Sequence, residues 1–477
     1  MGPGRGDSAG CASLPTPMSP PTAVSSRSEE LRELWKLAIP IAIAQAGQSL
    51  MGFVDTAVLA RAGTSILAAV ALSNAALFVV GSFGVGLMIG VDPLVSQAMG
   101  AGNPSRARTL LWQGSYLAVL AGLVLAVPVV VVPRLLPHFG WGFEELPHVQ
   151  DYLTWRAPGL PLMMLFITTR AYLQAVGRTG VLVVATVVAN LFNLAADILL
   201  VFGGADLPAF FGPLRAVPAM GAKGAAIATT LCTLVQWLIV SVAVRRVPVS
   251  GGAPSRRPVP ADMLQALRVG VPIGLQIIAD EGIHALTSVL ARGLGPESVS
   301  AHQIAISYSI FSFTVAVGIG NAASVRVGWA VGARNASQAR LSGQLALFSG
   351  ACFMACSGLL FVLFPEQLAR LIGAAPDVVS LLVPLLMVLA LFQLSDGVLA
   401  VGSGVLRGMG ETRFPSTAVL VGHYLVGLPV GLVLAVVLNY GVVGLWVGLC
   451  VGLATVALAI LWRFERLSTG PLQPLEA

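Results

Sequence analysis

Long apolar runs separated by short polar connectors fill the chain from Leu34 to about residue 465. Each run has roughly the 20 residues that an α-helix needs to cross the hydrocarbon core of a bilayer. The pattern therefore predicts an all-α integral membrane protein with about twelve transmembrane helices. The predicted spans are 35–58, 67–92, 109–132, 152–175, 181–202, 222–244, 269–291, 299–325, 343–364, 379–404, 416–438 and 442–462.

Composition agrees with this pattern and narrows the function classes. Of the 477 residues, 56% are apolar and only 10% are charged, against about 25% charged in a typical soluble domain. The net charge of +6 comes from basic residues that lie between the apolar runs, so we expect no nucleic-acid partner. The five cysteines form no CxxC pair and have no spaced histidines beside them, which predicts neither a zinc site nor another structural metal site.

The connectors alternate in charge, and this alternation predicts the topology. One set of connectors holds about three times as many Lys and Arg residues as the other, and basic residues favour the cytoplasmic side. We therefore expect both termini in the cytoplasm of a multi-pass protein of the cytoplasmic (inner) membrane. The predicted divisions are a disordered cytoplasmic tail (1–32), an N-lobe of six helices (33–244), a cytoplasmic linker (245–264), a C-lobe of six helices (265–466) and a second cytoplasmic tail (467–477).

Two halves of the chain repeat each other. GAGNPSRAR, which starts at Gly100, recurs 232 residues later as GARNASQAR, and LQAVGRT from Leu173 is echoed by LRGMGET from Leu406. Matched segments in the same order indicate a duplicated unit. Because each unit holds an even number of spans, the two lobes are expected to be related by a pseudo-two-fold axis along the membrane normal. A substrate would then bind in the cleft between the lobes, although a duplicated membrane scaffold without transport would show the same repeat.

Six carboxylates fall inside the predicted spans. An acidic side chain at the centre of a spanning helix costs about 2.5–3.5 kcal/mol on insertion, so each one needs a partner, a proton or a water-filled cavity. These residues are therefore the first candidates for a functional site. They are Asp55, Asp92, Asp197, Asp280, Glu281 and Asp396.

In the first half, Asn190, Asn193 and Asp197 follow one another at helical i, i+3, i+7 spacing, and Asp55 lies deep in the first span. This spacing predicts one polar face on the fifth span. Oxygen atoms from two helices suit Na⁺ or a shared proton. The alternative is a structural polar clamp between helices, which for Asn190 is as good an interpretation.

In the second half, Asp280 and Glu281 are adjacent on one helix and point about 100° apart, so we expect only one of them to face a cavity. Asp396 is the expected partner. Asp92 precedes Pro93 near the end of the second span, where it either serves a site or caps a helix kink.

Several longer segments are also distinctive, among them LAIPIAIAQAGQSLMGFVDTAVLA, DPLVSQAMGAGNPSRAR, NLFNLAADILLVFG and GVLRGMGET. They resemble the multidrug and toxic compound extrusion (MATE) transporters, specifically the bacterial branch. The resemblance covers about residues 33–465, both halves in order. It implies alternating access between two lobes and efflux of organic, often cationic compounds against an inward flow of Na⁺ or H⁺.

The resemblance also implies roles for individual residues. The matched positions for coupling to the cation or proton are Asp55, Asn193, Asp197, Glu281 and Asp396. The matched or neighbouring positions for further substrate or ion contacts are Asp92, Gln97, Asn190, Thr229 and Asp280. Both lobes thus carry candidate sites, and the resemblance leaves open which of them couples and to which ion.

We therefore interpret the chain as a cation-coupled multidrug exporter, with drugs or other organic cations as substrates and the lipid bilayer around it. We expect a monomer that uses no cofactor other than its coupling ion, Na⁺ or H⁺. The sequence contains no nucleotide loop and no nucleophile beside a base, so an enzyme is not expected. The alternatives are a flippase for lipid-linked oligosaccharides or peptidoglycan precursors, and a channel or receptor.

Overall fold

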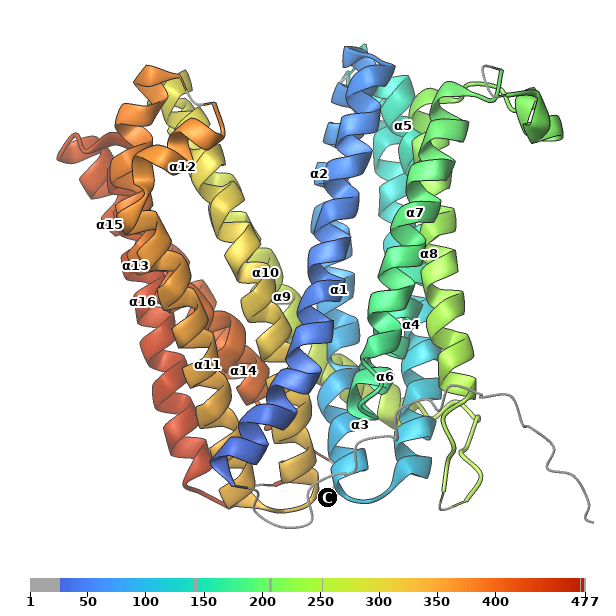
Figure 1. Ribbon diagram of the computed structural model, residues 1–477, viewed down its shortest axis with the longest axis vertical. Helices are drawn as coiled ribbons and strands as arrows, with labels where there is room; N and C mark the ends of the chain where they lie inside the picture. The colour runs from blue at the N-terminus through green and yellow to red at the C-terminus, as the bar shows by residue number, and fades with distance from the viewer. Residues whose placement is uncertain are drawn as a thin grey trace, which may run out of the picture.

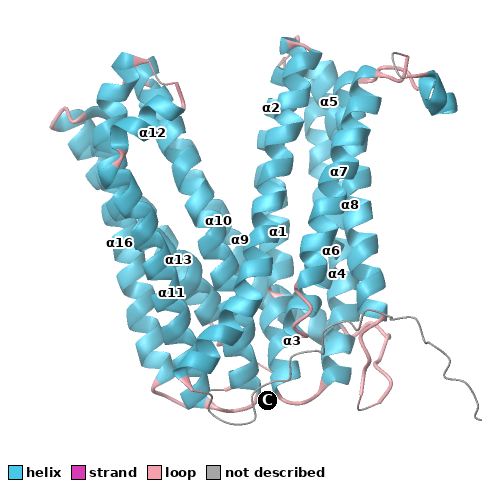
Figure 2. Ribbon diagram, viewed as in Figure 1, coloured by secondary structure: helices cyan, strands magenta, loops and turns pink. Residues whose placement is uncertain are grey.

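The structure is a computed structural model that describes residues 26–140, 142, 144–205, 208–250, 252–373, 375–471 and 473–475. All regular elements within these residues are helices (Figure 2). They are α1 (Arg27–Ala62), α2 (Thr64–Ile89), α3 (Val91–Gly100), α4 (Pro104–Leu135), η1 (Leu136–Phe139), α5 (Leu146–Arg156), α6 (Gly159–Ala175), α7 (Gly180–Phe202), η2 (Ala209–Ala216), α8 (Gly221–Arg245), α9 (Pro260–Arg292), α10 (Pro296–Gly332), α11 (Ala336–Leu363), α12 (Pro365–Leu371), α13 (Pro376–Gly408), α14 (Arg413–Leu420), η3 (Val421–Gly427), α15 (Leu428–Leu432), η4 (Val433–Val437) and α16 (Gly441–Ser468).

Ten helical segments of the described chain are long and apolar enough to cross a membrane. The other two predicted spans are also helical. One is divided between α5 and α6 near Pro158, which cannot donate a backbone hydrogen bond, and the other is α9, which carries Asp280 and Glu281 along its length. The predicted all-α membrane architecture of about twelve spans is confirmed.

Parts of both predicted tails lie within the described residues and contact the helices or cap them. Residues 1–25 of the predicted first tail lie outside the described residues, but α1 begins at Arg27 because Ser26 caps it. The Ser26 Oγ accepts a hydrogen bond from the Glu29 N–H at 3.3 Å, and the Glu29 carboxylate accepts one from the Ser26 N–H at 2.9 Å, which is a capping box. In the second tail, the Leu475 N–H donates to Gln97 Oε1 at 2.8 Å.

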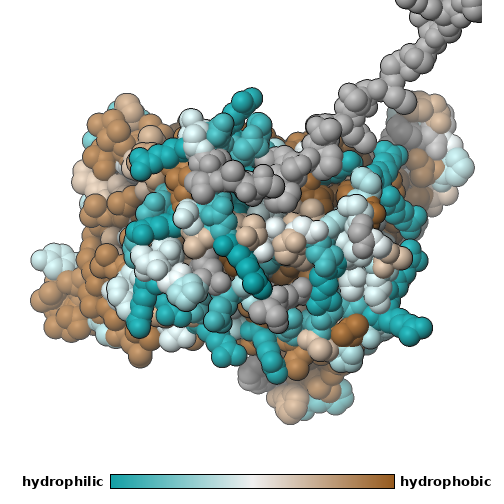
Figure 3. All heavy atoms as spheres, turned by 90° about the horizontal axis from the view of Figure 1, so that it is seen from below, coloured by the Kyte–Doolittle hydropathy of each residue, from teal (hydrophilic) through white to brown (hydrophobic). Residues whose placement is uncertain are grey.

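The helices form two lobes, α1 to α8 and α9 to α16 (Figure 1). The lobes approach each other at the end of the molecule where α1 begins and where the connection between α8 and α9 lies, and they diverge towards the other end. We call the end where they meet the terminal face. Hydrophilic side chains gather over this face, and hydrophobic ones lie along parts of its edge (Figure 3).

The first helix of each lobe begins inside the other lobe. Leu34, Leu37 and Ile41 of α1 belong to the hydrophobic core built mainly by α10, α11, α13 and α16. Val269 and Ile273 of α9 belong to the core of the first lobe. The first part of α1 therefore packs in the core of the second lobe, and the first part of α9 packs in the core of the first lobe. The predicted lobe boundaries assigned each helix to one lobe only.

Small residues allow α1 and α9 to cross the neighbouring helices closely. These small residues occur at equivalent positions in the two halves of the sequence. A Cβ atom added to Gly86 of α2 would lie 2.3 Å from Gly274 Cα of α9. The positions related to this pair by the 232-residue offset are Gly318 of α10 and Ala42 of α1, and a Cβ on Gly318 would lie 2.7 Å from Ala42 Cβ. The same close contact thus occurs twice, as a pseudo-two-fold axis requires.

Polar contacts between the lobes are concentrated at the terminal face, and they are paired in the same way. Gln97 Nε2 of α3 donates to the Gly408 carbonyl oxygen of α13 at 2.9 Å. The counterpart of Gln97 is Trp329 of α10, whose Nε1 donates to the Ala175 carbonyl oxygen of α6 at 3.0 Å.

Two acidic residues at equivalent positions of the repeat also form contacts between the lobes at the terminal face. Asp262 of α9 forms a bidentate ion pair with Arg106 of α4, at 2.7 and 2.8 Å. The corresponding Glu30 of α1 accepts hydrogen bonds from Gln338 Nε2 and Ser342 Oγ, each at 2.6 Å, and it also pairs with Arg326. These contacts join the lobes at one end of the molecule.

Candidate functional site: an interlobe cavity and two acidic clusters

A cavity of about 590 Å³ lies between the lobes. Its wall includes residues of α1, α2, α6 and α8 from the first lobe and of α9, α10, α13 and α14 from the second. Apolar and aromatic side chains such as Phe78, Phe166 and Phe313 make up much of the wall. Its charged residues are Arg156, Arg170, Asp280, Glu281, Arg407 and Glu411. Such a wall suits a bulky organic molecule with polar groups at its ends.

In the first lobe, Asp55 of α1 meets Asn193 and Asp197 of α7. The Asn193 side-chain amide donates to Asp55 Oδ1 and also to Asp197 Oδ2, the latter at 2.8 Å. The side chains of Asn193 and Asp197 are buried. One amide nitrogen therefore bridges two carboxylates from different helices, so the structure brings these three predicted residues together.

Some oxygen atoms of this cluster accept no hydrogen bond from the described residues. Asn193 Oδ1 and Asp197 Oδ1 are buried and have no hydrogen-bond donor within the described residues. Unpaired buried oxygens from an amide and a carboxylate are ligands that a hard cation prefers, and a carboxylate oxygen also binds a proton. The donor set therefore fits either Na⁺ or H⁺.

Thr229 of α8 connects this cluster to the interlobe cavity. It lines the interlobe cavity and also a small pocket of about 60 Å³ that Asp55, Asn74 and Tyr152 line. Tyr152 closes one side of this pocket, where its hydroxyl donates to Asn74 Oδ1 at 3.0 Å. The hydroxyl of Thr229 itself donates to the Ala225 carbonyl oxygen at 2.9 Å.

Asn190 shares the predicted face of α7, but its amide nitrogen donates to backbone atoms and not to the two carboxylates, while its Oδ1 is buried without a donor among the described residues. Its Nδ2 donates to the Gly47 carbonyl oxygen of α1 at 2.9 Å and to the Thr186 carbonyl oxygen at 3.0 Å. Gly47 permits this approach, because a Cβ there would lie 2.5 Å from Thr186. In this structure Asn190 thus clamps α7 to α1.

In the second lobe, both Asp280 and Glu281 line the cavity. We expected only one of them to face the cavity squarely, and both contribute to its lining. α9 stands at the boundary between the lobes, where it packs against α2, so two side chains about 100° apart both reach the cavity. Asp280 Oδ1 also lies 3.0 Å from His423 Nε2 of η3.

Asp396 of α13 lies behind these two residues. Its side chain is buried and is not part of the cavity wall. Asp280 and Glu281 are within electrostatic range of its carboxyl group. The second lobe therefore holds three acidic side chains close enough to repel one another when charged, and a bound cation or proton would relieve that repulsion.

The remaining two predicted residues lie near the terminal face. Asp92 is buried in the first turn of α3, and its Oδ1 has no hydrogen-bond donor within the described residues. Gln97 uses both ends of its amide on backbone atoms, with Nε2 on Gly408 and Oε1 on Leu475. In this structure Gln97 thus joins the two lobes by hydrogen bonds, and it does not line the cavity.

Three arginines line the cavity, and none of them was predicted as a site residue. Arg407, which the sequence pattern placed in a connector, lies on α13 and donates to Asn321 Oδ1 at 2.8 Å. Arg170 of α6 donates to Gln45 Oε1 at 3.0 Å. Both act electrostatically on Asp92. The repeat did contain a signal, because LRGMGET matches LQAVGRT and so aligns Arg407 with the intramembrane position Gln174.

Comparison with known proteins identifies the family. The MatE family model matches residues 40–199 and 272–433, one segment in each half of the chain. The chain belongs to the MatE family. These two matched segments contain Asp55, Asn193 and Asp197 in the first lobe and Asp280, Glu281 and Asp396 in the second, so both acidic clusters lie within MatE-family sequence.

Bacterial relatives in the MatE family are similar over nearly the whole chain. The multidrug resistance protein NorM of Burkholderia vietnamiensis is 33% identical over 458 residues, which are 93% of this chain and 95% of that protein. The probable multidrug resistance protein NorM of Bradyrhizobium diazoefficiens is 32% identical over 449 residues, which are 92% of this chain and 94% of that protein.

Solved MATE transporters share the fold. The eukaryotic MATE transporter AtDTX14 superposes with a TM-score of 0.79 at 20% identity, covering 93% of this chain and 98% of that one. A MATE transporter in an outward-facing conformation superposes with a TM-score of 0.80 at 19% identity, covering 95% of this chain and 100% of that one. The two-lobe helical architecture is therefore that of the MatE family.

Proposed function

We propose that this chain is a secondary multidrug exporter, which moves organic, often cationic compounds out of the cell in exchange for Na⁺ or H⁺. Its relatives of similar length are named multidrug resistance proteins. The observation that carries the proposal is the cavity between the lobes, which has a carboxylate cluster on each side. The apolar wall suits a hydrophobic compound, and Asp280 and Glu281 in that wall can pair with its positive charge.

The proposed mechanism is alternating access. The lobes are joined at the terminal face and diverge from it. Because basic connectors favour the cytoplasmic side, we assign the terminal face to the cytoplasm, which would make the protein open outwards. Binding of Na⁺ or H⁺ between Asp55, Asn193 and Asp197 would neutralise charge between α1 and α7 and change how these helices pack. Drug would leave on the outer side, and ion release would follow once the contacts at the terminal face open.

Inside-out membrane vesicles test this proposal directly. A fluorescent organic cation is added outside, and the vesicle lumen is either loaded with Na⁺ or acidified. We expect uptake with one of the two gradients and loss of uptake when that gradient is dissipated. Absence of uptake with both gradients, in protein shown to be folded, would overturn the proposal.

Variants locate the coupling residues within the same assay. Asp55→Asn, Asp197→Asn, Glu281→Gln and Asp396→Asn each remove one charge at nearly constant volume. We expect coupled uptake to be lost in the variants of the lobe that couples. Normal uptake in all four variants would rule out the acidic clusters as coupling sites.

A second candidate is a flippase for lipid-linked oligosaccharides or peptidoglycan precursors, because three arginines line the cavity. Arginine binds phosphates through paired N–H donors. In reconstituted vesicles, a fluorescent lipid diphosphate would then change leaflets, and Arg170→Gln with Arg407→Gln would stop it. Movement of this lipid together with no uptake of organic cations would favour the flippase.

A further inference from the structure

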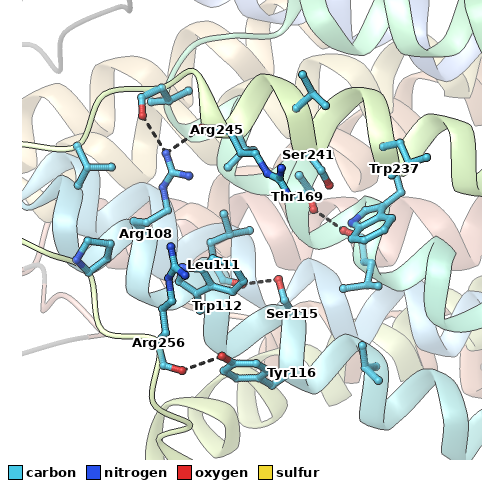
Figure 4. A pocket seen from close by; sticks show the side chains of 18 residues that line it. Arg108, Leu111, Trp112, Ser115, Tyr116, Thr169, Trp237, Ser241, Arg245 and Arg256 are labelled. Carbon is cyan, nitrogen blue, oxygen red and sulfur yellow. Dashed lines mark hydrogen bonds between the residues drawn. The ribbon is translucent and has the colours of Figure 1, made fainter.

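A second cavity of the described chain lies outside the interlobe site. It measures about 890 Å³ and is bounded by α4, α6, α8 and the connection that follows α8 (Figure 4). None of its lining residues lines the interlobe cavity or carries a carboxylate. The proposed export mechanism gives it no role.

We call this cavity the groove. Its lining changes from polar at one end to apolar at the other. Arg108 and Arg256 lie together at one end in Figure 4, and Trp237 lies at the other. Arg108 is one turn above the start of α4, and Arg245 ends α8, so the arginines are at the terminal face. Val119, Leu238 and other apolar residues continue the groove away from that face, and their side chains are exposed.

The connection after α8 is held over the groove by side chains of α4. The Tyr116 hydroxyl donates to the Arg256 carbonyl oxygen at 2.7 Å. Gln113 donates to the Arg257 carbonyl oxygen and accepts from the Val259 N–H, each at 2.8 Å. These bonds fix the backbone on both sides of Arg256, and its guanidinium lies 5.1 Å from the centre of the Trp112 ring.

The three arginines of the groove have different tasks. Arg108 is buried and donates to the carbonyl oxygens of Val244 and Val247, at 3.0 and 3.1 Å, so it supports the end of α8. Arg245 and Arg256 are exposed at the mouth. No acidic side chain lines the groove, so the groove itself offers these two arginines no carboxylate partner.

The other lobe provides an internal comparison. Arg340 occupies the position 232 residues after Arg108, and it forms an ion pair with Glu465 at 2.7 Å. The corresponding charge there is neutralised by the protein itself. In the first lobe, no carboxylate lines the corresponding groove.

We propose that this groove binds one anionic phospholipid of the leaflet at the terminal face. Arg245 and Arg256 hold the phosphate, Trp112, Tyr116 and Trp237 border the level of the headgroup, and an acyl chain follows the apolar part of the groove. Arginine suits a phosphate, and Trp and Tyr favour the membrane interface. The bound lipid links α4 and α8 to the segment that joins the two lobes.

Lipid binding to the purified full-length protein tests this proposal. Native mass spectrometry compares phosphatidylglycerol with phosphatidylcholine of the same acyl chains, and inorganic phosphate serves as the competitor. We expect the phosphatidylglycerol to bind and the phosphatidylcholine to be lost. Equal retention of both lipids would overturn the proposal, and so would displacement of phosphatidylglycerol by an equal concentration of inorganic phosphate.

Two double variants separate the groove from general surface charge. Arg245→Gln with Arg256→Gln should weaken phosphatidylglycerol binding about thirtyfold, because each basic residue near a membrane surface contributes about five- to sixfold. Arg246→Gln with Arg257→Gln removes the same charge from neighbouring residues outside the groove and should leave binding unchanged. Equal losses in the two variants would show that only net charge matters.

A third variant tests the apolar part of the groove. Ser241→Trp fills the space beside α8 and keeps all three arginines. We expect it to reduce phosphatidylglycerol binding at least tenfold, with the thermal midpoint of the lipid-free protein unchanged in all variants. Undiminished binding by folded Ser241→Trp protein would contradict an acyl chain in this groove.

Discussion

Gly100 of α3 and Trp329 of α10 touch backbone to backbone, so that a Cβ atom added to Gly100 would lie 2.1 Å from the Trp329 carbonyl oxygen. The repeat places the reciprocal pair beside it, where a Cβ on Gly332 would lie 2.0 Å from the Gln97 carbonyl oxygen. The two copies of one duplicated segment are thus packed against each other at the terminal face.

Gly100→Ala tests this contact. The added methyl group has no room against the backbone of α10, so we expect a loss of about 1–3 kcal/mol, as for other overpacked sites. The measurement is the thermal midpoint of unfolding in detergent. Gly52→Ala is the matched control, because nothing lies within 4 Å of a Cβ there. Equal midpoints for the two variants would show that α3 and α10 part easily.

The buried acidic residue of α1 predicts a second stability effect. Glu30→Gln leaves Arg326 without a negative partner in a site where both side chains are at most 4% exposed. Breaking a buried ion pair costs about 3–5 kcal/mol. Unfolding of the purified protein measures the effect. Glu33→Gln is the control, because Glu33 pairs with Lys36 at the surface, and it should cost less than about 1 kcal/mol.

Alternating access predicts that linking the lobes at the terminal face stops transport. Cysteines at positions 106 and 262, which form the interlobe ion pair, are joined by a short bifunctional reagent in protein without native cysteines. We expect uptake to stop and to return when a cleavable linker is cut. Cysteines at 340 and 465 provide the control, because that ion pair joins α11 and α16 of one lobe. Full transport by the linked 106–262 protein would show that the start of α9, which packs in the core of the first lobe, moves with that lobe during transport.

The bridge through Asn193 predicts that the first-lobe cluster acts as one unit. Asp55→Asn combined with Asp197→Asn should impair coupled uptake no more than the more severe single variant, because groups that act together are not additive. Asn190→Ala is the comparison, since the Asn190 amide nitrogen donates to backbone oxygens and not to either carboxylate, and we expect this variant to retain coupling. Losses that multiply in the double variant would indicate two independent sites.

Much of this architecture was predictable from the sequence. The length and spacing of the apolar runs predicted the helices, because the thickness of a bilayer leaves a spanning segment few other forms. Because burying a charge in a membrane costs free energy, Asp55 and Asp197 were candidates for a functional site, and the structure places both beside Asn193. The offset between GAGNPSRAR and GARNASQAR predicted two related lobes.

Other features depended on how distant helices pack. Periodicity gave Asn190 and Asn193 the same face of α7, and only the position of α1 decided that the first clamps a backbone and the second bridges two acids. Adjacent acids on α9 both reached the cavity because that helix stands between the lobes. Arg407 faced inwards because α13 extends further than its apolar run. The sequence by itself determined which segments enter the membrane and that the unit is duplicated, since those depend on local hydrophobicity. The tertiary structure alone decided which polar side chains meet, because that depends on rotations and crossings of helices remote in the chain.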